Sequence, residues 1–554
     1  MTADAFTREI IHRALGAVGE EIFAALKRTS MSPIIYETLD CAVGITDAKG
    51  EILSQGNGVI TFLGTLDAAV RLTLRKFDGR IEPGDVFITN DPYEGGGTHL
   101  SDVTLVLPVF HERRLVAFVA NKAHWTEVGG MAAGSFTTDS TEVYQEGLQF
   151  PLVKLMERGS VNTALIELIR ANVRLPDQTL GDLWAGIAAN RVGETRVLEL
   201  FERYGREAME GAMDSLLDYG ERMVLEELKR LPKGTFTASD SIGGDGLGGG
   251  PYHVEASVTV EDDRFTIDFT GTGPQVAGSI NTTRTGMESR ARGVFRAITA
   301  PHLPTNGGMF RPLRVICPDG TLFTAERPAP TSTYWESGGF VIDLVWKALA
   351  VHVPERLPAG SFLSVCATIL KTEDPSSGEL SLLVEPLAGG WGAGCGKDGE
   401  SGQFCPGNGD TYNIPVEVTE KRHPVRVLRY GFHTEDGGAG RLRGGKGVVL
   451  DYEVECDKAW LTAIFGRSRF PSWGLEGGQD GSPNRIEVHR RDGAVEHHGS
   501  VARLPLERGD VVRLITGTGG GFGDPRERPR DTVLADVNNG YITERQAREH
   551  YGMD

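Results

Sequence analysis

Two histidines and an aspartate flank a pair of short apolar runs in a pattern that suits a metal ion. His99 and Asp102 form a His-x-x-Asp pair before the first run, and His124 follows the second. Two imidazoles and one carboxylate are a ligand set that zinc, manganese and iron(II) accept while positions stay open for water or substrate. The same spacing also fits histidines that only lie at the surface or cap a strand. The pattern therefore predicts a divalent transition metal but leaves the structural alternative open.

The apolar runs themselves, Val103–Phe110 and Leu115–Asn121, are of strand length, rich in β-branched residues and separated by a short polar loop. They predict a buried antiparallel hairpin, whose far ends bring His99 and Asp102 close to His124. The register decides how they meet. A five-residue connection places Asp102 directly opposite His124, whereas a four-residue connection turns their side chains to opposite faces.

The elements around this hairpin predict a mixed α and β (α+β) fold. Apolar residues at helical spacing predict a helix at residues 7–29, strands around a turn follow at 35–54, and residues 162–230 are helical almost throughout. Alternating patterns after Gly234 predict β-rich central and C-terminal units. The predicted units are an N-terminal α/β unit with the metal site (1–160), a helical segment packed on it (161–232), a central β-rich unit (233–410) and a C-terminal β-rich unit with a glycine-rich tail (411–554).

Composition excludes several classes of protein. The 554 residues carry a formal charge of −19 without a basic stripe, which argues against a nucleic-acid surface. No apolar run reaches membrane-spanning length, and the N-terminus lacks the basic-then-apolar order of a secretory signal. Six cysteines without a C-x-x-C pair fit reduced thiols. We therefore expect a cytoplasmic protein with no nucleic-acid or membrane partner.

The glycine-rich runs do not predict a nucleotide site. No G-x-x-x-x-G-K-[ST] motif occurs, and Gly392–Asp398 lacks both the glycine spacing and the hydroxyl residue after lysine. The tail Gly517–Gly523 superficially fits a dinucleotide fingerprint, but no βαβ unit follows it. We interpret the tail as a tight turn.

Longer motifs, spread in order from Arg8 to Tyr551, resemble the hydantoinase B/oxoprolinase family. That family comprises the partners of ATP-dependent hydantoinases, lactamases and 5-oxoprolinases, and the corresponding subunits of acetone and acetophenone carboxylases. The resemblance is carried by N-D-P-Y-E-G-G-G-T-H-L-S-D-V at Asn90–Val103, E-G-L-Q-F-P at Glu146–Pro151, R-A-N-V-R-L-P at Arg170–Pro176, G-D-L at Gly181–Leu183, D-F-T-G-T at Asp268–Thr272 and T-G-T-G-G-G-F-G-D-P at Thr516–Pro525.

The resemblance implies roles for particular residues. His99, Asp102 and His124 match the family's metal ligands residue for residue, and Asp40 aligns with an acidic position near that site. We therefore expect Asp40 as a further ligand or catalytic group. Lys122 and Glu146 are the other candidate catalytic residues, expected to position the activated substrate or, for Glu146, to act as a base.

The resemblance also implies a partner and a reaction. In this family the phosphorylating machinery belongs to a hydantoinase A-type ATP-binding subunit, so we expect a hetero-oligomer in which Mg-ATP is used at the partner. The implied function is hydrolysis of a phosphate-activated small cyclic amide. The alternatives are a subunit of an ATP-dependent ketone carboxylase of the acetone or acetophenone type, or a non-catalytic scaffold. Hydantoin, N-methylated hydantoin, 5-oxoproline and larger lactams remain equally open as substrates.

Overall fold

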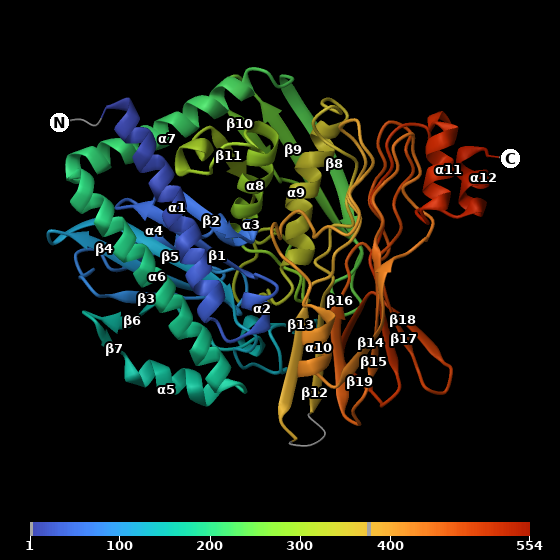
Figure 1. Cartoon of the computed structure of the whole chain (residues 1–554), viewed down its shortest axis with the longest axis horizontal. Helices are drawn as coiled ribbons and strands as arrows, with labels where there is room; N and C mark the ends of the chain where they lie inside the picture. Colours follow the sequence, from blue (N-terminus) through green and yellow to red (C-terminus); the bar gives the residue numbers. More distant parts are fainter. Residues whose placement is uncertain (1–3, 374–377, 554) are drawn as a thin grey trace.

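The computed structural model describes residues 4–373 and 378–553, and its mixed α and β architecture confirms the predicted fold class. In Figure 1 the N-terminal half, blue to green, wraps helices around a large sheet. The C-terminal half, yellow to red, ends in further sheets and a pair of short helices. Among the described residues, no helix is both long and apolar enough to cross a membrane.

A seven-stranded sheet in the order β2-β1-β5-β4-β3-β6-β7 underlies the N-terminal half. All its neighbouring strands are antiparallel. Its strands are β1 (Cys41–Asp47), β2 (Ile52–Gly58), β3 (Val86–Thr89), β4 (Asp102–His111), β5 (Arg114–His124), β6 (Val153–Glu157) and β7 (Ser160–Val161).

The predicted hairpin is the pair β4 and β5, and a bulge sets its register. Residues 112–113 form a two-residue turn with positive φ at both positions, as a tight hairpin turn requires. If the two strands paired from this turn without a bulge, Asp102 would lie opposite Ala123. The pairing instead skips Val116, which shifts the register by one residue and places Asp102 opposite His124. The register is the one predicted for a five-residue connection, but a shorter turn plus a bulge produces it.

Helices pack on both faces of this sheet. The side chains of its central strands are therefore buried on both sides. Leu105 and Val119 face α6, where Gly186 and Gly193 allow close approach. Val106 packs with its neighbours on the opposite face, under α4. The helices of this half are α1 (Ala5–Thr29), α2 (Pro33–Tyr36), α3 (Ile60–Leu63), α4 (Leu66–Lys76), η1 (Val143–Gln145), α5 (Thr163–Asn172), α6 (Pro176–Tyr204) and α7 (Arg206–Leu228).

A second sheet, β11-β10-β9-β8, packs against α9. The two long helices of this region start at Arg284 (α8) and at Trp335 (α9). The start of α9 brings Tyr334 and Trp335 into the interior. The elements are β8 (Gly234–Ile242), β9 (Tyr252–Val260), β10 (Phe265–Asp268), α8 (Arg284–Thr299), η2 (Gly307–Phe310), β11 (Leu313–Ile316) and α9 (Trp335–Ala350).

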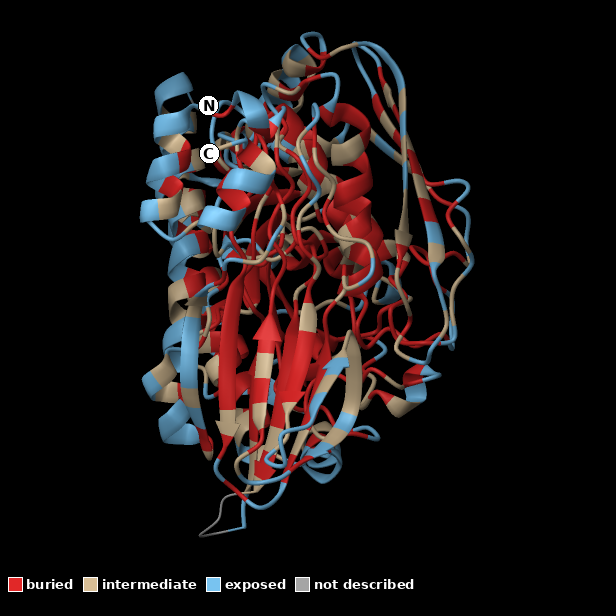
Figure 2. Cartoon of the chain, turned by 90° about the vertical axis from the view of Figure 1, so that its right-hand side faces the viewer, coloured by how far each residue is buried: buried red, intermediate tan, exposed pale blue. Residues whose placement is uncertain are grey.

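Two further sheets, β13-β12-β16-β19 and β14-β15-β20-β17-β18, share one apolar core. Central strands such as β15 are buried, whereas the edge strands β14 and β18 are largely exposed, as Figure 2 shows. The sheet β13-β12-β16-β19 takes strands from both sides of residue 410. The domain boundary predicted at that residue stays a prediction. The elements are β12 (Ala367–Glu373), β13 (Leu380–Glu385), α10 (Val416–Arg422), β14 (Val425–Phe432), β15 (Val448–Val454), β16 (Ala459–Ile464), β17 (Arg485–His489), β18 (Val495–His498), β19 (Ser500–Leu506), β20 (Val511–Ile515), η3 (Pro525–Glu527), α11 (Arg530–Asn538) and α12 (Glu544–Tyr551).

Three glycine-rich runs interlock beside these sheets. The run 389–399, the run 437–447 and the tail 517–523 exchange backbone hydrogen bonds, such as Gly519 N–H to the carbonyl of Gly445. A Cβ atom on Gly445 would lie 1.8 Å from the carbonyl oxygen of Glu400, and one on Gly519 would lie 2.0 Å from that of Trp391. The tail is therefore part of a packed backbone layer, and its interpretation as a tight turn did not anticipate these long-range contacts.

A buried histidine makes the stability of this half depend on pH. Burial, with Arg422 adding to it, lowers the pKa of His423 to about 4 from 6.5. The unfolded chain therefore takes up the proton first as pH falls, so stability should be lost between pH 6.5 and 4, by roughly 3 kcal/mol at the lower end. In urea titrations at several pH values, His423→Leu should flatten that dependence. An unchanged slope in the variant would contradict this assignment.

Candidate metal centre

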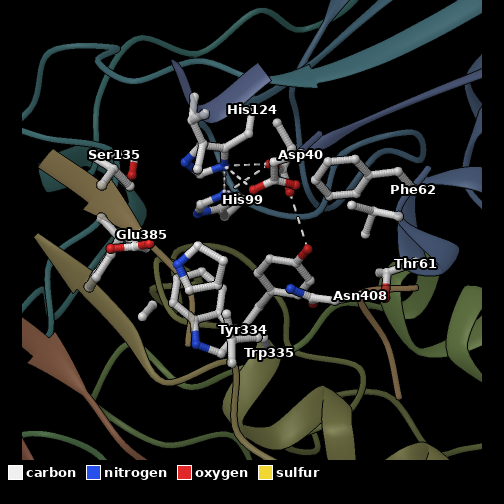
Figure 3. Close-up of a pocket in the computed structure, with 18 of the residues that line it drawn as sticks. Asp40, Thr61, Phe62, His99, His124, Ser135, Tyr334, Trp335, Glu385 and Asn408 are labelled. Carbon is white, nitrogen blue, oxygen red and sulfur yellow. Dashed lines mark hydrogen bonds and ion pairs between the residues drawn. The ribbon is translucent and has the colours of Figure 1, made fainter. Parts of the chain in front are cut away.

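The candidate ligands lie in a loop and two strands of the seven-stranded sheet. His99 ends the glycine-rich loop after β3, Asp102 begins β4, and His124 ends β5. The loop must fold tightly here, because a Cβ atom on Gly97 would lie 2.2 Å from the carbonyl oxygen of Asp91. Figure 3 shows His99 and His124 on one side of a cavity, with Tyr334 and Trp335 across from them.

The donor atoms of the three residues converge. His99 Nε2 lies 3.2 Å from His124 Nδ1 and 3.1 Å from Asp102 Oδ1, and His124 Nδ1 lies 2.9 Å from the same oxygen. Ligand atoms about 2.1 Å from an ion and at right angles to each other are separated by about 3.0 Å. The three atoms thus have the spacing of one triangular face of a coordination octahedron.

The hydrogen-bonding capacity of the three side chains favours a cation between them. His99 Nδ1 lies 3.0 Å from the carbonyl oxygen of Ser332, which only accepts, so this nitrogen carries the proton. In the neutral imidazole, Nε2 then presents a lone pair toward Asp102 Oδ1, which is also an acceptor when ionised. While both imidazoles are neutral, a proton on His124 can satisfy one of these contacts but not both. A second proton on His99 would also meet the carboxylate, and it would bring the positive charge that a metal ion would supply. A metal ion satisfies all three donors at once, so the residues present fit such a group.

The surroundings hold Asp102 in its charged form. Its other oxygen accepts hydrogen bonds from Thr98 Oγ1 at 2.5 Å and from the Tyr334 hydroxyl at 3.2 Å. Burial opposes ionisation, but the adjacent His99 and His124 outweigh it and keep the pKa of Asp102 well below its usual range. The carboxylate is thus available as an anionic ligand.

Asp40 lies beside the triad rather than within it. Its Oδ2 atom is 3.9 Å from His124 Nδ1, and the group of converging donor atoms consists of His99, Asp102 and His124. Burial raises the pKa of Asp40 to about 7, although the nearby His124 opposes this. Its carboxyl group lines the cavity. The fourth-ligand role of Asp40 stays a prediction, and its position suits a proton acceptor equally well.

Lys122 shares the sheet face of His124, but its ammonium group turns away from the cavity. Nζ donates to Thr65 Oγ1 at 2.6 Å and to the carbonyl of Gly96 at 2.7 Å, and the ring of Phe62 lies over it. Phe62 lines the cavity and Lys122 does not. The structure therefore does not bring Lys122 to the site, and its contacts instead fix the loop that precedes His99.

Glu146 is also absent from the cavity wall, and it supports the site from behind. Its carboxylate accepts hydrogen bonds from the backbone N–H groups of Thr331 and Ser332 and from the Ser140 hydroxyl, at 2.8–3.1 Å. The Ser332 carbonyl in turn accepts from His99 Nδ1. Glu146 thus contacts the backbone that orients His99, which supports a positioning role, and its catalytic role stays a prediction.

We expect Glu146→Gln to weaken metal binding without unfolding the protein. The amide nitrogen of glutamine would face backbone N–H donors, disturbing the carbonyl that orients His99. Such supporting contacts typically change metal affinity by about 10- to 100-fold. Competition with a chelator measures the dissociation constant, and Glu142→Gln, on the exposed side of the same loop, serves as the control. Equal affinities in all three proteins would refute the positioning role.

The cavity has a volume of about 50 Å³, a few times what one water molecule needs. Sequence reasoning missed most of its wall, because those residues come from segments far from the hairpin and carry no spacing motif. The missed residues include Thr61 and Phe62 of α3, Phe136, Arg290 of α8, Tyr334 and Trp335 at the start of α9, Glu385 and Asn408.

These features define a protein that holds two imidazoles and a carboxylate at a cavity between an antiparallel sheet and the start of a buried helix. The chain belongs to the hydantoinase B/oxoprolinase family, whose model matches residues 4–525. Membership confirms the family that the sequence motifs predicted.

Relatives match over nearly the full chain. It is 30% identical to the putative B-type subunit of a D-/L-hydantoinase from Pseudomonas sp. (strain NS671), across 99% of this chain and 95% of that protein. The crystal structure of the ATP-dependent caprolactamase from Pseudomonas jessenii superimposes with a TM-score of 0.94 at 30% identity, covering 100% of this chain and 97% of that one. Nucleotide-free acetone carboxylase matches with a TM-score of 0.92 at 20% identity, covering 99% of this chain and 79% of that one, a likeness of fold.

Proposed function

We propose that this chain is the metal-binding subunit of an ATP-dependent cyclic amidohydrolase, active with a hydantoinase A-type partner that uses Mg-ATP. The observation that carries the proposal is the convergence of His99, Asp102 and His124 at the wall of a cavity. Family membership and the names of the relatives, a putative D-/L-hydantoinase and an ATP-dependent caprolactamase, support the choice of a cyclic amide as substrate.

The proposed chemistry begins with an amide that resists water. Its resonance makes the carbonyl carbon a poor electrophile, and phosphorylation of the amide oxygen by the partner removes that resonance. In this chain one water adds to the activated carbon, the ring C–N bond breaks as nitrogen takes a proton, and an acyl phosphate remains. A second water converts it to a carboxylate and inorganic phosphate. A divalent metal ion at the triad would lower the pKa of water and polarise the substrate oxygen.

The chain's own residues supply the rest. His99 and His124 are oriented by Ser332 and Asp102, so their nitrogens point to a single position. Asp40, on the cavity wall, is placed to accept the proton that each attacking water loses. The apolar part of the cavity wall, which includes Phe62, limits the access of bulk water to the reactive phosphate intermediates.

Ring opening should require both subunits and ATP. The chain alone, supplied with metal, hydantoins or lactams and Mg-ATP, should give no turnover, because its sequence lacks a phosphate-binding loop of the G-x-x-x-x-G-K-[ST] type. With the partner added, ring-opened product and ADP should appear together. Turnover of ketones that depends on bicarbonate, without ring opening, would replace this proposal by the carboxylase alternative. Ring opening by the chain alone would contradict the role of the partner.

A further inference from the structure

The cavity contains a buried guanidinium group that forms no ion pair with any described residue. Arg290 of α8 lines the cavity and is only 3% exposed. Its Nε and Nη1 atoms are buried without a hydrogen-bond partner, and no ion pair joins it to a described carboxylate. Its neighbours on the same helix differ, since Arg284 pairs with Asp319 and Arg292 with Asp67.

An uncompensated guanidinium in the interior is costly, so its position calls for a ligand. The fold makes room for it. Gly338 on α9 faces the guanidinium, and a Cβ atom there would lie 2.6 Å from Arg290 Cζ. The ring of Tyr334 stacks on it, with Cζ 4.8 Å from the ring centre, which offsets part of the desolvation. These contacts hold the charge in place but give its N–H groups no acceptor.

Other unpartnered groups in the same cavity are also hydrogen-bond donors. Ser135 Oγ and Trp335 Nε1 are buried and form no hydrogen bond of normal geometry with a described residue. The indole N–H, which can only donate, lies near enough to the Glu336 carboxylate to oppose the rise that burial causes in the pKa of that group. The carboxylate of Glu385 reaches the wall but is occupied by Asn413, the backbone N–H of Ile414 and Tyr452. Around Arg290 the described cavity wall therefore offers unpartnered donors, whereas the carboxylates of Asp40 and Asp102 lie at the triad. A ligand bound at the guanidinium should bring oxygen acceptors and negative charge.

The donors adjoin the metal centre. Tyr334 stacks on Arg290 with its ring and donates its hydroxyl proton to Asp102 Oδ2. Trp335 packs edge-on against His99, with ring centres 5.5 Å apart. An anion held by Arg290 therefore lies one aromatic ring away from the triad, within reach of a molecule that is bound at the metal.

We infer that Arg290, with Trp335 and Ser135, forms an oxyanion-binding subsite for the phosphoryl group of the activated amide and for the inorganic phosphate that it becomes. The inference rests on the proposed function. In the last step a water oxygen bonds to the acyl carbon. The bond between that carbon and the bridging oxygen of the phosphate group then breaks, and the phosphate leaves with the electron pair. Arg290 balances the charge of that leaving group and holds it apart from the triad.

Binding of inorganic phosphate to the purified full chain tests the subsite without ATP or a partner. The chain is first treated with a chelator, so that phosphate cannot bind through a metal ion. Calorimetric titration should show phosphate binding that weakens about tenfold or more in Arg290→Gln, since charged hydrogen bonds are lost. Arg290→Lys should retain part of it. Arg284→Gln removes a charge from the solvent side of the same helix and should bind phosphate like the wild type.

Thermal unfolding separates a binding role from a structural one. If Arg290 is kept for a ligand, Arg290→Met should unfold at the same or a higher temperature without phosphate, and phosphate should stabilise the wild type alone. A less stable variant with unchanged phosphate binding would overturn the inference, as would equal phosphate affinity in wild type and Arg290→Gln, or tighter binding of acetate than of phosphate. Phosphate binding that depends on Arg290 in a chain that opens no ring with its partner would leave the subsite standing and refute the proposed function alone.

Discussion

His124→Ala should lose its metal ion and its turnover together while the fold survives. The wild-type chain should contain about one equivalent of a divalent transition metal by elemental analysis, and the variant almost none. Two of the three converging donors remain in the variant, but an ion held by one imidazole and one carboxylate is far more weakly bound. Because the metal contributes several kcal/mol to the transition state, turnover with the partner should fall about a thousandfold or more.

His253→Ala is the matched control for this experiment. His253 lies on β9, is more than half exposed and pairs with Glu255 on the same strand. Its removal should change neither metal content nor turnover, and far-ultraviolet circular dichroism should match in all three proteins. Full turnover in His124→Ala would eliminate the assigned centre. Metal retained by the folded variant would show that the ion binds elsewhere.

Much of this centre could be predicted from sequence because a hairpin is a local structure. Apolar periodicity located β4 and β5, and the antiparallel pairing then brought His99, Asp102 and His124 to one end. The register could not be derived, because it depends on the bulge at Val116. A bulge reflects how a strand packs against both of its neighbours, here β4 and β1, and not the identity of one residue.

The roles of Lys122 and Glu146 show a second limit. A period of two places Lys122 on the same face as His124, but it does not say how far a long side chain extends. Its ammonium group passes behind Phe62 to the carbonyl of Gly96. Glu146 is close in sequence to the hairpin, yet its carboxylate faces the backbone of residues 331–332. Sequence proximity identified which segments lie near the site. Only the three-dimensional packing shows which residues line the cavity and which hold the lining residues in place.

The glycine-rich runs show the same limit on a larger scale. Glycine in a sequence predicts that the backbone can turn sharply or approach another segment closely, but it does not identify that segment. Gly445 and Gly519 meet across more than seventy positions of the chain, and Gly519 also faces the carbonyl of Trp391. Such contacts are set by the long-range pairing of the sheets, which local patterns do not encode.

Gly445→Ala should therefore be among the most destabilising single substitutions in the protein. The added Cβ atom would lie 1.8 Å from the carbonyl oxygen of Glu400 and 2.4 Å from its carbon, so backbone must move on a segment that is itself hydrogen-bonded. Overpacking in a well-packed interior costs about 1–3 kcal/mol, and an overlap with rigid backbone places this variant at or above the top of that range. Thermal unfolding should begin several degrees lower, or little soluble protein should be obtained.

Gly431→Ala is the matched control for this prediction. Gly431 lies on the edge strand β14, and a Cβ atom there would meet nothing within 4 Å. The same chemical change at this position should leave the unfolding temperature close to that of the wild type, because it adds a methyl group to open space. If both variants unfold alike, the interlocked glycine runs do not limit stability. If only Gly445→Ala is destabilised, the close backbone contacts among the three glycine-rich runs contribute to the stability of the fold.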